Sequence, residues 1–147
     1  MHPIFGVIAG QIPVSQTPLL ACIDDEPSIR EAIKGLLKAS GLTAQTFPSA
    51  EEFLKFDRLK DTSCLIMDVQ LGGMSGLQFQ NHLTKSGYGI PIIFITAFPD
   101  ERIRERALGA GAVGFLSKPV TKKGLLTCIH AALHRGDGTA HSLWVKE

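Results

Sequence analysis

The sequence lacks any apolar run long enough to cross a membrane, since a spanning helix needs about 20 consecutive apolar residues. The apolar stretch nearest the start, residues 4–12, contains Gly6 and Gly10, and no lysine or arginine precedes it. A secretory signal would have a positively charged start and an unbroken apolar segment. We therefore expect no membrane contact, and we interpret residues 1–17 as a flexible leader outside the fold.

Cysteine is scarce, and its spacing excludes the usual cysteine chemistry. Cys22, Cys64 and Cys128 are odd in number and lack the close pairs of a zinc site or a redox motif. Two of them lie inside apolar segments that read as strands. We therefore predict reduced, buried cysteines, which are typical of a cytoplasmic protein.

The chain also has little net charge. Lysine and arginine number 15 and aspartate and glutamate 14, so the formal charge is +1. No basic footprint covers the whole chain, and we expect no direct nucleic-acid binding. With 44% hydrophobic and 20% charged residues, the 147-residue chain fits one folded domain.

What the sequence does contain is a series of short apolar runs that end in polar residues. Four such runs, residues 19–23, 64–67, 92–95 and 113–117, lead into Asp24-Asp25, Asp68, Thr96 and Lys118-Pro119. They are too short for helices and rich in branched side chains. This pattern is typical of parallel strands that are buried on both faces of a sheet.

Helical signals fill the segments between the strands. Pro27 suits the first position of a helix, Ser49 and Glu52 match a capping box, and Thr121 is a suitable cap for the last helix. Strand and helix alternate five times over residues 18–135. The sequence therefore predicts an α/β fold, a flavodoxin-like (βα)5 doubly wound parallel sheet with strand order 2-1-3-4-5, followed by a loose tail at 136–147.

The polar residues after the strands predict one chemical site. In a parallel sheet they meet at the carboxyl edge, where open α/β sheets hold ligands. Asp24, Asp25 and Asp68 would repel one another there, so a cation has to compensate, and Mg²⁺ prefers oxygen ligands. Lys118 adds a second positive group. An aspartate beside Mg²⁺ and an ammonium is a good phosphoryl acceptor, with Thr96 placed to bind the transferred group.

These motifs resemble the receiver domain of two-component response regulators. The resemblance covers roughly Pro18 to Arg135 and rests on Asp24-Asp25-Glu26, Asp68, Gly73-Met74-Ser75-Gly76, Thr96-Ala97 and Phe115-Leu116-Ser117-Lys118-Pro119. Residues 74–77 and 93–96 are similar to the FixJ-like branch, whose members usually add a helix-turn-helix output domain. No such domain follows in this sequence, so we expect a stand-alone receiver.

The resemblance implies a role for each acidic residue. Asp68 matches the phosphoacceptor, and Asp24 and Asp25 match the acidic pair that binds Mg²⁺. Asp68 and the backbone carbonyl of Gln70 complete the implied ligand set. Mg²⁺ is the cofactor that we expect.

The resemblance also implies a switch. Thr96 matches the hydroxyl that binds the phosphoryl group, and Phe115 matches the aromatic side chain whose rotamer follows it. Lys118 matches the ammonium that neutralises the phosphoryl oxygens. The Lys118–Pro119 peptide bond matches one that is cis in the family.

The function so implied is a signalling receiver and not an enzyme with a separate substrate. A sensor histidine kinase or a phosphotransfer protein would supply the phosphoryl group. The receiver would catalyse only its own phosphorylation and dephosphorylation. Phosphorylation would alter the surface of the fourth helix and fifth strand, which is also the expected face of a homodimer.

Some positions depart from the family pattern. Gly72 stands where most members have proline, which loosens the loop after Asp68. Gln70 and Phe98 lie two residues after Asp68 and Thr96, at positions that influence hydrolysis of the phosphoryl group. We expect the bulky Phe98 to shield the aspartyl phosphate and prolong the phosphorylated state.

Three alternatives stay open on sequence grounds. A haloacid-dehalogenase-type phosphatase also uses a strand-end aspartate, Mg²⁺ and lysine, although it carries a second aspartate where this chain has Gln70. A further possibility is that the chain is a receiver fragment of a FixJ-like DNA-binding transcriptional regulator, with residues 136–147 starting the linker. A nucleotide-binding flavodoxin-like module is weaker, because Asp24-Asp25-Glu26 occupies the turn that a phosphate-binding glycine loop would need.

Overall fold

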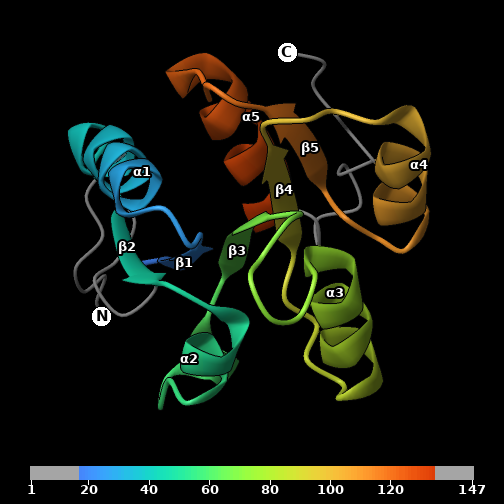
Figure 1. Cartoon of the computed structure of the whole chain (residues 1–147). Helices are drawn as coiled ribbons and strands as arrows, with labels where there is room; N and C mark the ends of the chain where they lie inside the picture. Colours follow the sequence, from blue (N-terminus) through green and yellow to red (C-terminus); the bar gives the residue numbers. More distant parts are fainter. Residues whose placement is uncertain (1–16, 135–147) are drawn as a thin grey trace.

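In the computed structural model, which describes residues 17–134, strands and helices alternate along the chain (Figure 1). The described elements are β1 (Leu19–Ile23), α1 (Pro27–Ala39), β2 (Thr43–Phe47), α2 (Ala50–Leu54), the 3-10 turn η2 (Leu59–Asp61), β3 (Cys64–Asp68), α3 (Gly76–Lys85), β4 (Ile92–Thr96), α4 (Glu101–Gly109), β5 (Gly114–Ser117) and α5 (Lys122–Leu133). The predicted tail and nearly all of the predicted leader lie outside the described residues. No helix of residues 17–134 is long and apolar enough to cross a membrane.

The strands form one parallel sheet in the order β2-β1-β3-β4-β5, which confirms the predicted topology. β1 lies between β2 and β3, so the turn after β1 is next to the turn after β3. The register places Asp68 beside Ile95 of β4, and Thr96 beside Ser117 of β5. The carboxyl ends of four neighbouring strands therefore meet at one edge of the sheet.

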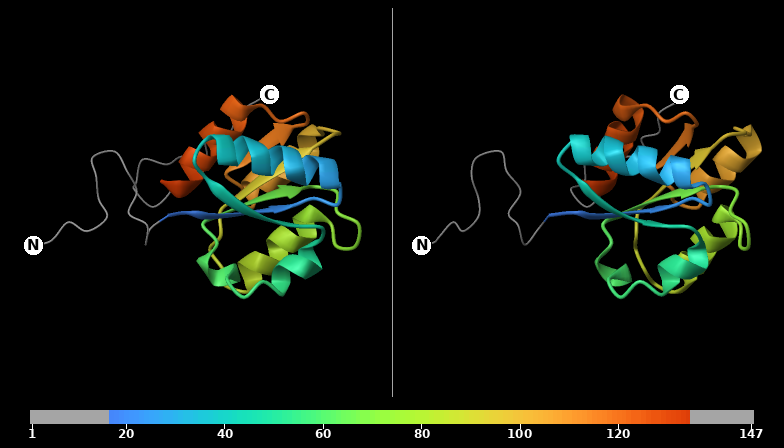
Figure 2. Two further views of the ribbon diagram at one scale, coloured as in Figure 1. Left: turned by 90° about the vertical axis from the view of Figure 1, so that its left-hand side faces the viewer. Right: turned by 60° about the vertical axis from the view of Figure 1, so that its left-hand side comes forward.

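Helices cover both faces of the sheet, as the side views show (Figure 2). On one face, Leu20 and Cys22 of β1 pack with apolar residues of α1 and α5. On the other face, Ala21 and Ile23 pack with residues of α2, α3 and α4. Successive strand residues point to opposite faces, and both faces are buried, so β1 is apolar throughout.

The helix starts follow local capping chemistry. Thr121 caps α5 by accepting a hydrogen bond from the Gly124 N–H at 3.0 Å, as predicted. Ser49 caps α2 by accepting one from the Glu52 N–H at 3.1 Å. The Glu52 carboxylate, however, pairs with Lys55, so the described bonds form only half of the predicted capping box.

The reciprocal capping box lies at the start of α3, where the sequence interpretation did not place one. The Ser75 hydroxyl accepts a hydrogen bond from the Gln78 N–H at 3.1 Å, and the Gln78 side chain accepts one from the Ser75 N–H at 3.0 Å. Both bonds satisfy N–H groups that the first turn of a helix leaves without partners. They fix the end of the loop that follows Asp68.

Candidate functional site

The polar residues that follow β1, β3 and β5 contact one another at the carboxyl edge of the sheet. The Lys118 ammonium, after β5, lies 2.7 Å from Asp68 Oδ2 at the end of β3 and 3.0 Å from Asp24 Oδ2 after β1. The side chains of all three are less than one tenth exposed. The structure thus brings together three of the residues that the sequence singled out.

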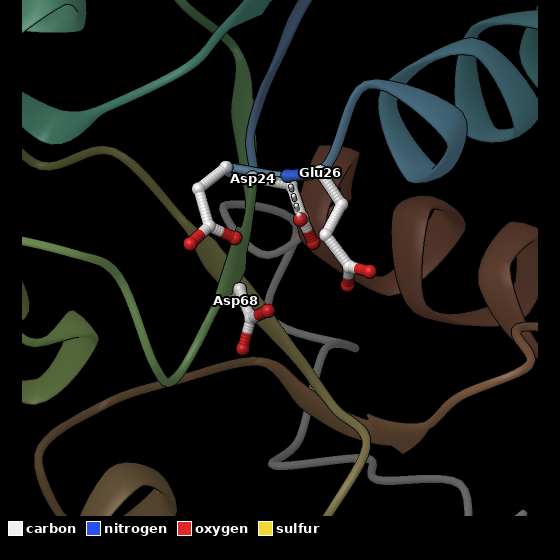
Figure 3. Close-up of side chains that lie close together, drawn as sticks. Asp24, Glu26 and Asp68 are labelled. Atoms are coloured by element: carbon white, nitrogen blue, oxygen red, sulfur yellow. Dashed lines mark hydrogen bonds between the residues drawn. The ribbon is translucent and has the colours of Figure 1, made fainter.

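Four carboxylates form an acidic cluster around this lysine. Asp24, Asp25, Glu26 and Asp68 each offer an oxygen within 4.8 Å of the others. Figure 3 shows the side chains of Asp24, Glu26 and Asp68, which come from the turn after β1 and from the end of β3. Asp24 and Asp68 are buried, whereas Asp25 and Glu26 reach solvent.

Glu26 was not assigned a site role from the sequence. Its carboxylate belongs to the cluster and lies 3.4 Å from the Lys118 ammonium. The available signal was its position directly after Asp25 in the same turn. That turn is held by the Glu26 N–H, which donates to Asp24 Oδ1 at 2.9 Å.

Asp24 is a buried carboxylate that lacks a full set of hydrogen bonds. Within the described part of the chain its Oδ2 accepts no well-oriented hydrogen bond, although the Lys118 ammonium lies 3.0 Å away. Burial raises the pKa of Asp24 by more than the Glu26 N–H and the Lys118 ammonium lower it. An additional cation would stabilise the ionised form of this group.

Lys118 supplies the positive charge of the cluster. Burial lowers the pKa of its ammonium, but the hydrogen bond to Asp68, together with the interactions with Asp24, outweighs burial and raises that pKa above the ordinary lysine value. Lys118 is therefore charged at neutral pH. The Lys118–Pro119 peptide bond that follows is cis, the isomer implied by the resemblance.

The loop after β3 holds Asp68 from the other side. Asp68 Oδ1 accepts a hydrogen bond from the Gln70 N–H at 2.8 Å. The metal-binding role of the Gln70 carbonyl stays a prediction. Gly76 lets α3 begin close to the strand end, because a Cβ there would lie 2.6 Å from the Asp68 carbonyl oxygen and 2.9 Å from the Val69 Cα.

Thr96 is the last residue of β4, and Phe115 lies within the neighbouring strand β5. Thr96 is buried, and its hydroxyl accepts a hydrogen bond from the Phe98 N–H at 3.1 Å. The Phe98 side chain is 70% exposed, so in this structure it faces solvent. Phe115 is buried with its ring centroid 6.4 Å from that of Phe94. The predicted switch pair thus consists of a buried hydroxyl and a buried ring.

The sequence around this site matches a known protein family. Residues 20–130, most of the described fold, match the model of the response regulator receiver domain. The chain belongs to the response regulator receiver family. Receiver domains belong to two-component signalling proteins, and their role in this family is to be phosphorylated. The receiver fold is a fold of signalling proteins and not that of a classical enzyme family.

Known relatives agree with this family. The chain is 39% identical to the transcriptional regulatory protein TdiR of Thauera aromatica, over 76% of this chain and 49% of that protein. It is 33% identical to the transcriptional regulatory protein FixJ of Azorhizobium caulinodans, over 77% of this chain and 54% of that protein. A solved structure of the response regulator StyR matches with a TM-score of 0.75 and 38% identity, over 83% of this chain and 62% of that one.

The receiver chain spans about half the length of these curated relatives. The similarity therefore concerns the receiver part of each regulator.

The residues present fit the Mg²⁺ that receiver domains generally bind at an acidic pocket. The donors are carboxylate oxygens, which a hard divalent cation prefers. One of them, Asp24 Oδ2, is buried, and among residues 17–134 its partner is the Lys118 ammonium at 3.0 Å, without a well-oriented hydrogen bond. Asp24, Asp25 and Asp68 are thus the residues that would hold the ion, and Glu26 is a fourth carboxylate within reach.

Proposed function

We propose that this receiver accepts a phosphoryl group on Asp68 from a sensor histidine kinase or a phosphotransfer protein, in a Mg²⁺-dependent reaction. The observation that carries the proposal is the 2.7 Å hydrogen bond from Lys118 to Asp68 inside a cluster of carboxylates. Asp68 is the last residue of β3, the central strand of the sheet, and it accepts hydrogen bonds from both the Lys118 ammonium and the N–H of the following loop.

The transfer itself needs few protein groups. A carboxylate oxygen of Asp68 attacks the phosphorus atom of a phosphohistidine, the P–N bond breaks, and its electron pair returns to the imidazole of the donor. Lys118 neutralises the developing charge on the phosphoryl oxygens. Mg²⁺ held by Asp24, Asp25 and Asp68 would supply further positive charge to stabilise the transferring phosphoryl group.

The signal that follows transfer is proposed to pass through Thr96. Its hydroxyl now accepts from the Phe98 N–H and can donate its own proton to a phosphoryl oxygen on Asp68. An inward movement of Thr96 lets the Phe115 ring follow and biases the neighbouring α4 and β5. The chain thereby converts a covalent change at the sheet edge into a change of surface.

We also propose that the face of α4 and β5 forms a homodimer after phosphorylation. The exposed side chains of α4 alternate in sign, with Glu101, Arg102, Glu105 and Arg106 in solvent. A face that carries both charges can pair with a second copy of itself about a twofold axis. Analytical ultracentrifugation with and without beryllofluoride tests this, and a monomer in both conditions contradicts it.

A phosphatase function has less support. The Gln70 N–H binds Asp68, and Gln70 has no acidic group to protonate a leaving alcohol as the haloacid-dehalogenase reaction requires.

Whether the receiver acts alone or as the first part of a DNA-binding regulator is decided by the length of the native gene product. The three cysteines are buried and form no disulfide in the described residues, which is consistent with the proposed cytoplasmic location.

Acetyl phosphate provides a direct test of the phosphoacceptor function. We expect the wild-type protein with Mg²⁺ to gain one phosphoryl group by intact-mass spectrometry, and to gain none when EDTA is present. Asp68→Asn should gain none, whereas Asp57→Asn, which removes an exposed carboxylate away from the site, should behave as wild type. An adduct on Asp68→Asn, or none on wild type, overturns the proposal.

A further inference from the structure

A positively charged residue lies where the α1 helix disfavours it. Arg30 is the fourth residue of α1, near the positive end of the helix dipole, and the acidic residue at this helix end is the N-cap Glu26, which precedes the first turn. Arg30 is half-buried. A cation in such a place needs a specific favourable contact.

That contact is with the acidic turn. Arg30 Nη1 donates to the backbone carbonyl of Asp24 at 2.7 Å, a short charge-assisted hydrogen bond. Within residues 17–134, Arg30 forms no ion pair with a carboxylate. The side chain is therefore directed at the main chain of the turn and not at its acidic groups.

The bond controls the geometry of two proposed metal ligands. The Asp24 carbonyl and the Asp25 N–H belong to one rigid peptide plane. The rest of Asp24 is already tethered, because its N–H donates to the Phe47 carbonyl at 3.2 Å and its Oδ1 accepts from the Glu26 N–H. Holding the plane between Asp24 and Asp25 fixes the direction in which the next residue leaves it.

We propose that Arg30 is a positioning residue for the Mg²⁺ site. It holds the Asp24–Asp25 peptide plane from α1, and thereby keeps both carboxylates directed into the acidic cluster. This inference rests on the proposed function, since it assumes that the cluster binds Mg²⁺. Arg30 itself contacts neither the ion nor the phosphoryl group.

Two effects of Arg30 on Mg²⁺ binding have opposite signs. As a nearby positive charge, Arg30 repels the ion, so removal of the charge alone would tighten binding. As a positioning residue, Arg30 orders the ligands, so its removal weakens binding. Residues that orient metal ligands typically change affinity by roughly 10-fold or more when they are replaced.

Isothermal titration of the full chain with Mg²⁺ separates these effects. We expect Arg30→Met to weaken Mg²⁺ binding by roughly 10-fold, and Arg30→Lys, which keeps a donor, to be intermediate. Lys34→Met is the matched control, because it removes an exposed positive charge one turn further along α1. It should leave the affinity unchanged or slightly increase it.

Two further readouts distinguish positioning from a loss of folding. Without Mg²⁺, the Glu26 amide should exchange faster in Arg30→Met while core amides keep wild-type rates. In phosphorylation by acetyl phosphate, the variant should need more Mg²⁺ for half-maximal rate but reach the wild-type maximum. If Arg30→Met is poorly folded, the same comparisons are made with Arg30→Lys and Arg30→Gln.

The possible failures can be told apart. Wild-type protein that binds Mg²⁺ together with an Arg30→Met variant of equal or higher affinity overturns the positioning role alone. Wild-type protein that binds no Mg²⁺ overturns the metal-dependent function and this inference together.

Discussion

Lys118 connects the strand ends of the site through its contacts with carboxylates. Its ammonium reaches Asp68 from β3 and both Asp24 and Glu26 from the turn after β1. Buried carboxylates repel one another, and Lys118 is the described cation that touches three members of the cluster. It therefore acts both in folding and in the proposed chemistry.

Replacement of Lys118 by alanine should destabilise the metal-free protein. Removing one partner from a buried ion pair leaves uncompensated charge, which typically costs about 3 kcal/mol. Mg²⁺ should then stabilise Lys118→Ala more than it stabilises wild type, since the ion returns positive charge to the cluster. Urea unfolding with and without Mg²⁺ measures both effects.

Lys122→Ala is the control for this experiment, because it removes an exposed lysine at the start of α5. It should change stability by less than about 0.5 kcal/mol. A Lys118→Ala protein as stable as this control would show that the lysine does not stabilise the cluster.

The raised pKa of Asp24 predicts how Mg²⁺ binding depends on pH. The folded, metal-free protein binds the Asp24 proton more tightly than the unfolded chain does, so ionised Asp24 lowers stability above its folded pKa. Stability is regained as pH falls through that value. The raised pKa of Lys118 adds stability throughout this range, and that part is lost only as pH rises through its folded value.

We therefore expect Mg²⁺ affinity to fall as the pH is lowered, beginning above the ordinary carboxyl range because protons compete for Asp24. Calorimetry in buffers of different ionisation enthalpy should detect proton release on binding at mildly acidic pH. An affinity that is constant down to about pH 4 would contradict the assignment of Asp24 as a ligand.

At the scale of elements, α4 buries little of its surface, with Ile103 and Leu108 only partly buried against the core. Among its residues only Ala107 is fully buried. The Ala107 carbonyl accepts hydrogen bonds from the buried Gln80 side chain on α3 and from the Ala112 N–H, each at 3.0 Å. An element with so little buried apolar surface is suited to move in a switch.

Gln80→Leu should loosen α4 while leaving the rest of the fold intact. The Ala107 carbonyl keeps its bond from Ala112, so the expected loss of stability is only about 1 kcal/mol. Amide exchange in α4 should become faster, and beryllofluoride binding should become tighter if α4 moves on activation. Asn81→Ala, which changes an exposed residue of α3 next to Gln80, is the control. Equal amide exchange rates in α4 of the two variants would contradict the role of Gln80.

The elements differ in how well the sequence predicted them. Strand positions followed from continuous apolar runs, and the starts of α1 and α5 followed from Pro27 and Thr121. In α3, Phe79, Gln80 and Leu83 are buried, while Leu77 is only partly so. The buried face of α3 is set by contacts with both the sheet and α4, and a local pattern does not contain the second contact.

The candidate site, like the fold, could be predicted only in part from the sequence. The meeting of Asp24, Asp68 and Lys118 could be predicted, because parallel strands place their carboxyl ends at one edge. The inclusion of Glu26 and the bond from Arg30 depend on the shape of the turn after β1, which the residue types alone do not define. The roles of these residues in phosphoryl transfer stay predictions.

For the molecule as a whole, the two apolar clusters are formed by described elements on both faces of the sheet. One contains residues of α1 and α5, and the other contains residues of α2, α3 and α4. The site lies at the sheet edge between these layers. Asp68 therefore lies next to strands whose side chains belong to both apolar clusters.

This arrangement predicts that residues 17–134 fold without the remaining sequence. The fragment should unfold cooperatively, with a free energy of unfolding within about 1 kcal/mol of the full chain. It should also bind Mg²⁺ with the same affinity. Urea unfolding and calorimetry of both proteins provide the measurement, and a fragment that unfolds without cooperativity would contradict the proposed domain boundaries.

The location of the phosphoryl group tests the central claim most directly. After treatment with acetyl phosphate and Mg²⁺, borohydride reduction converts an aspartyl phosphate to homoserine, which tandem mass spectrometry can place in the sequence. We predict homoserine at position 68 and at no other aspartate. Homoserine at position 24 or 25, or its absence from the whole chain, would contradict the account.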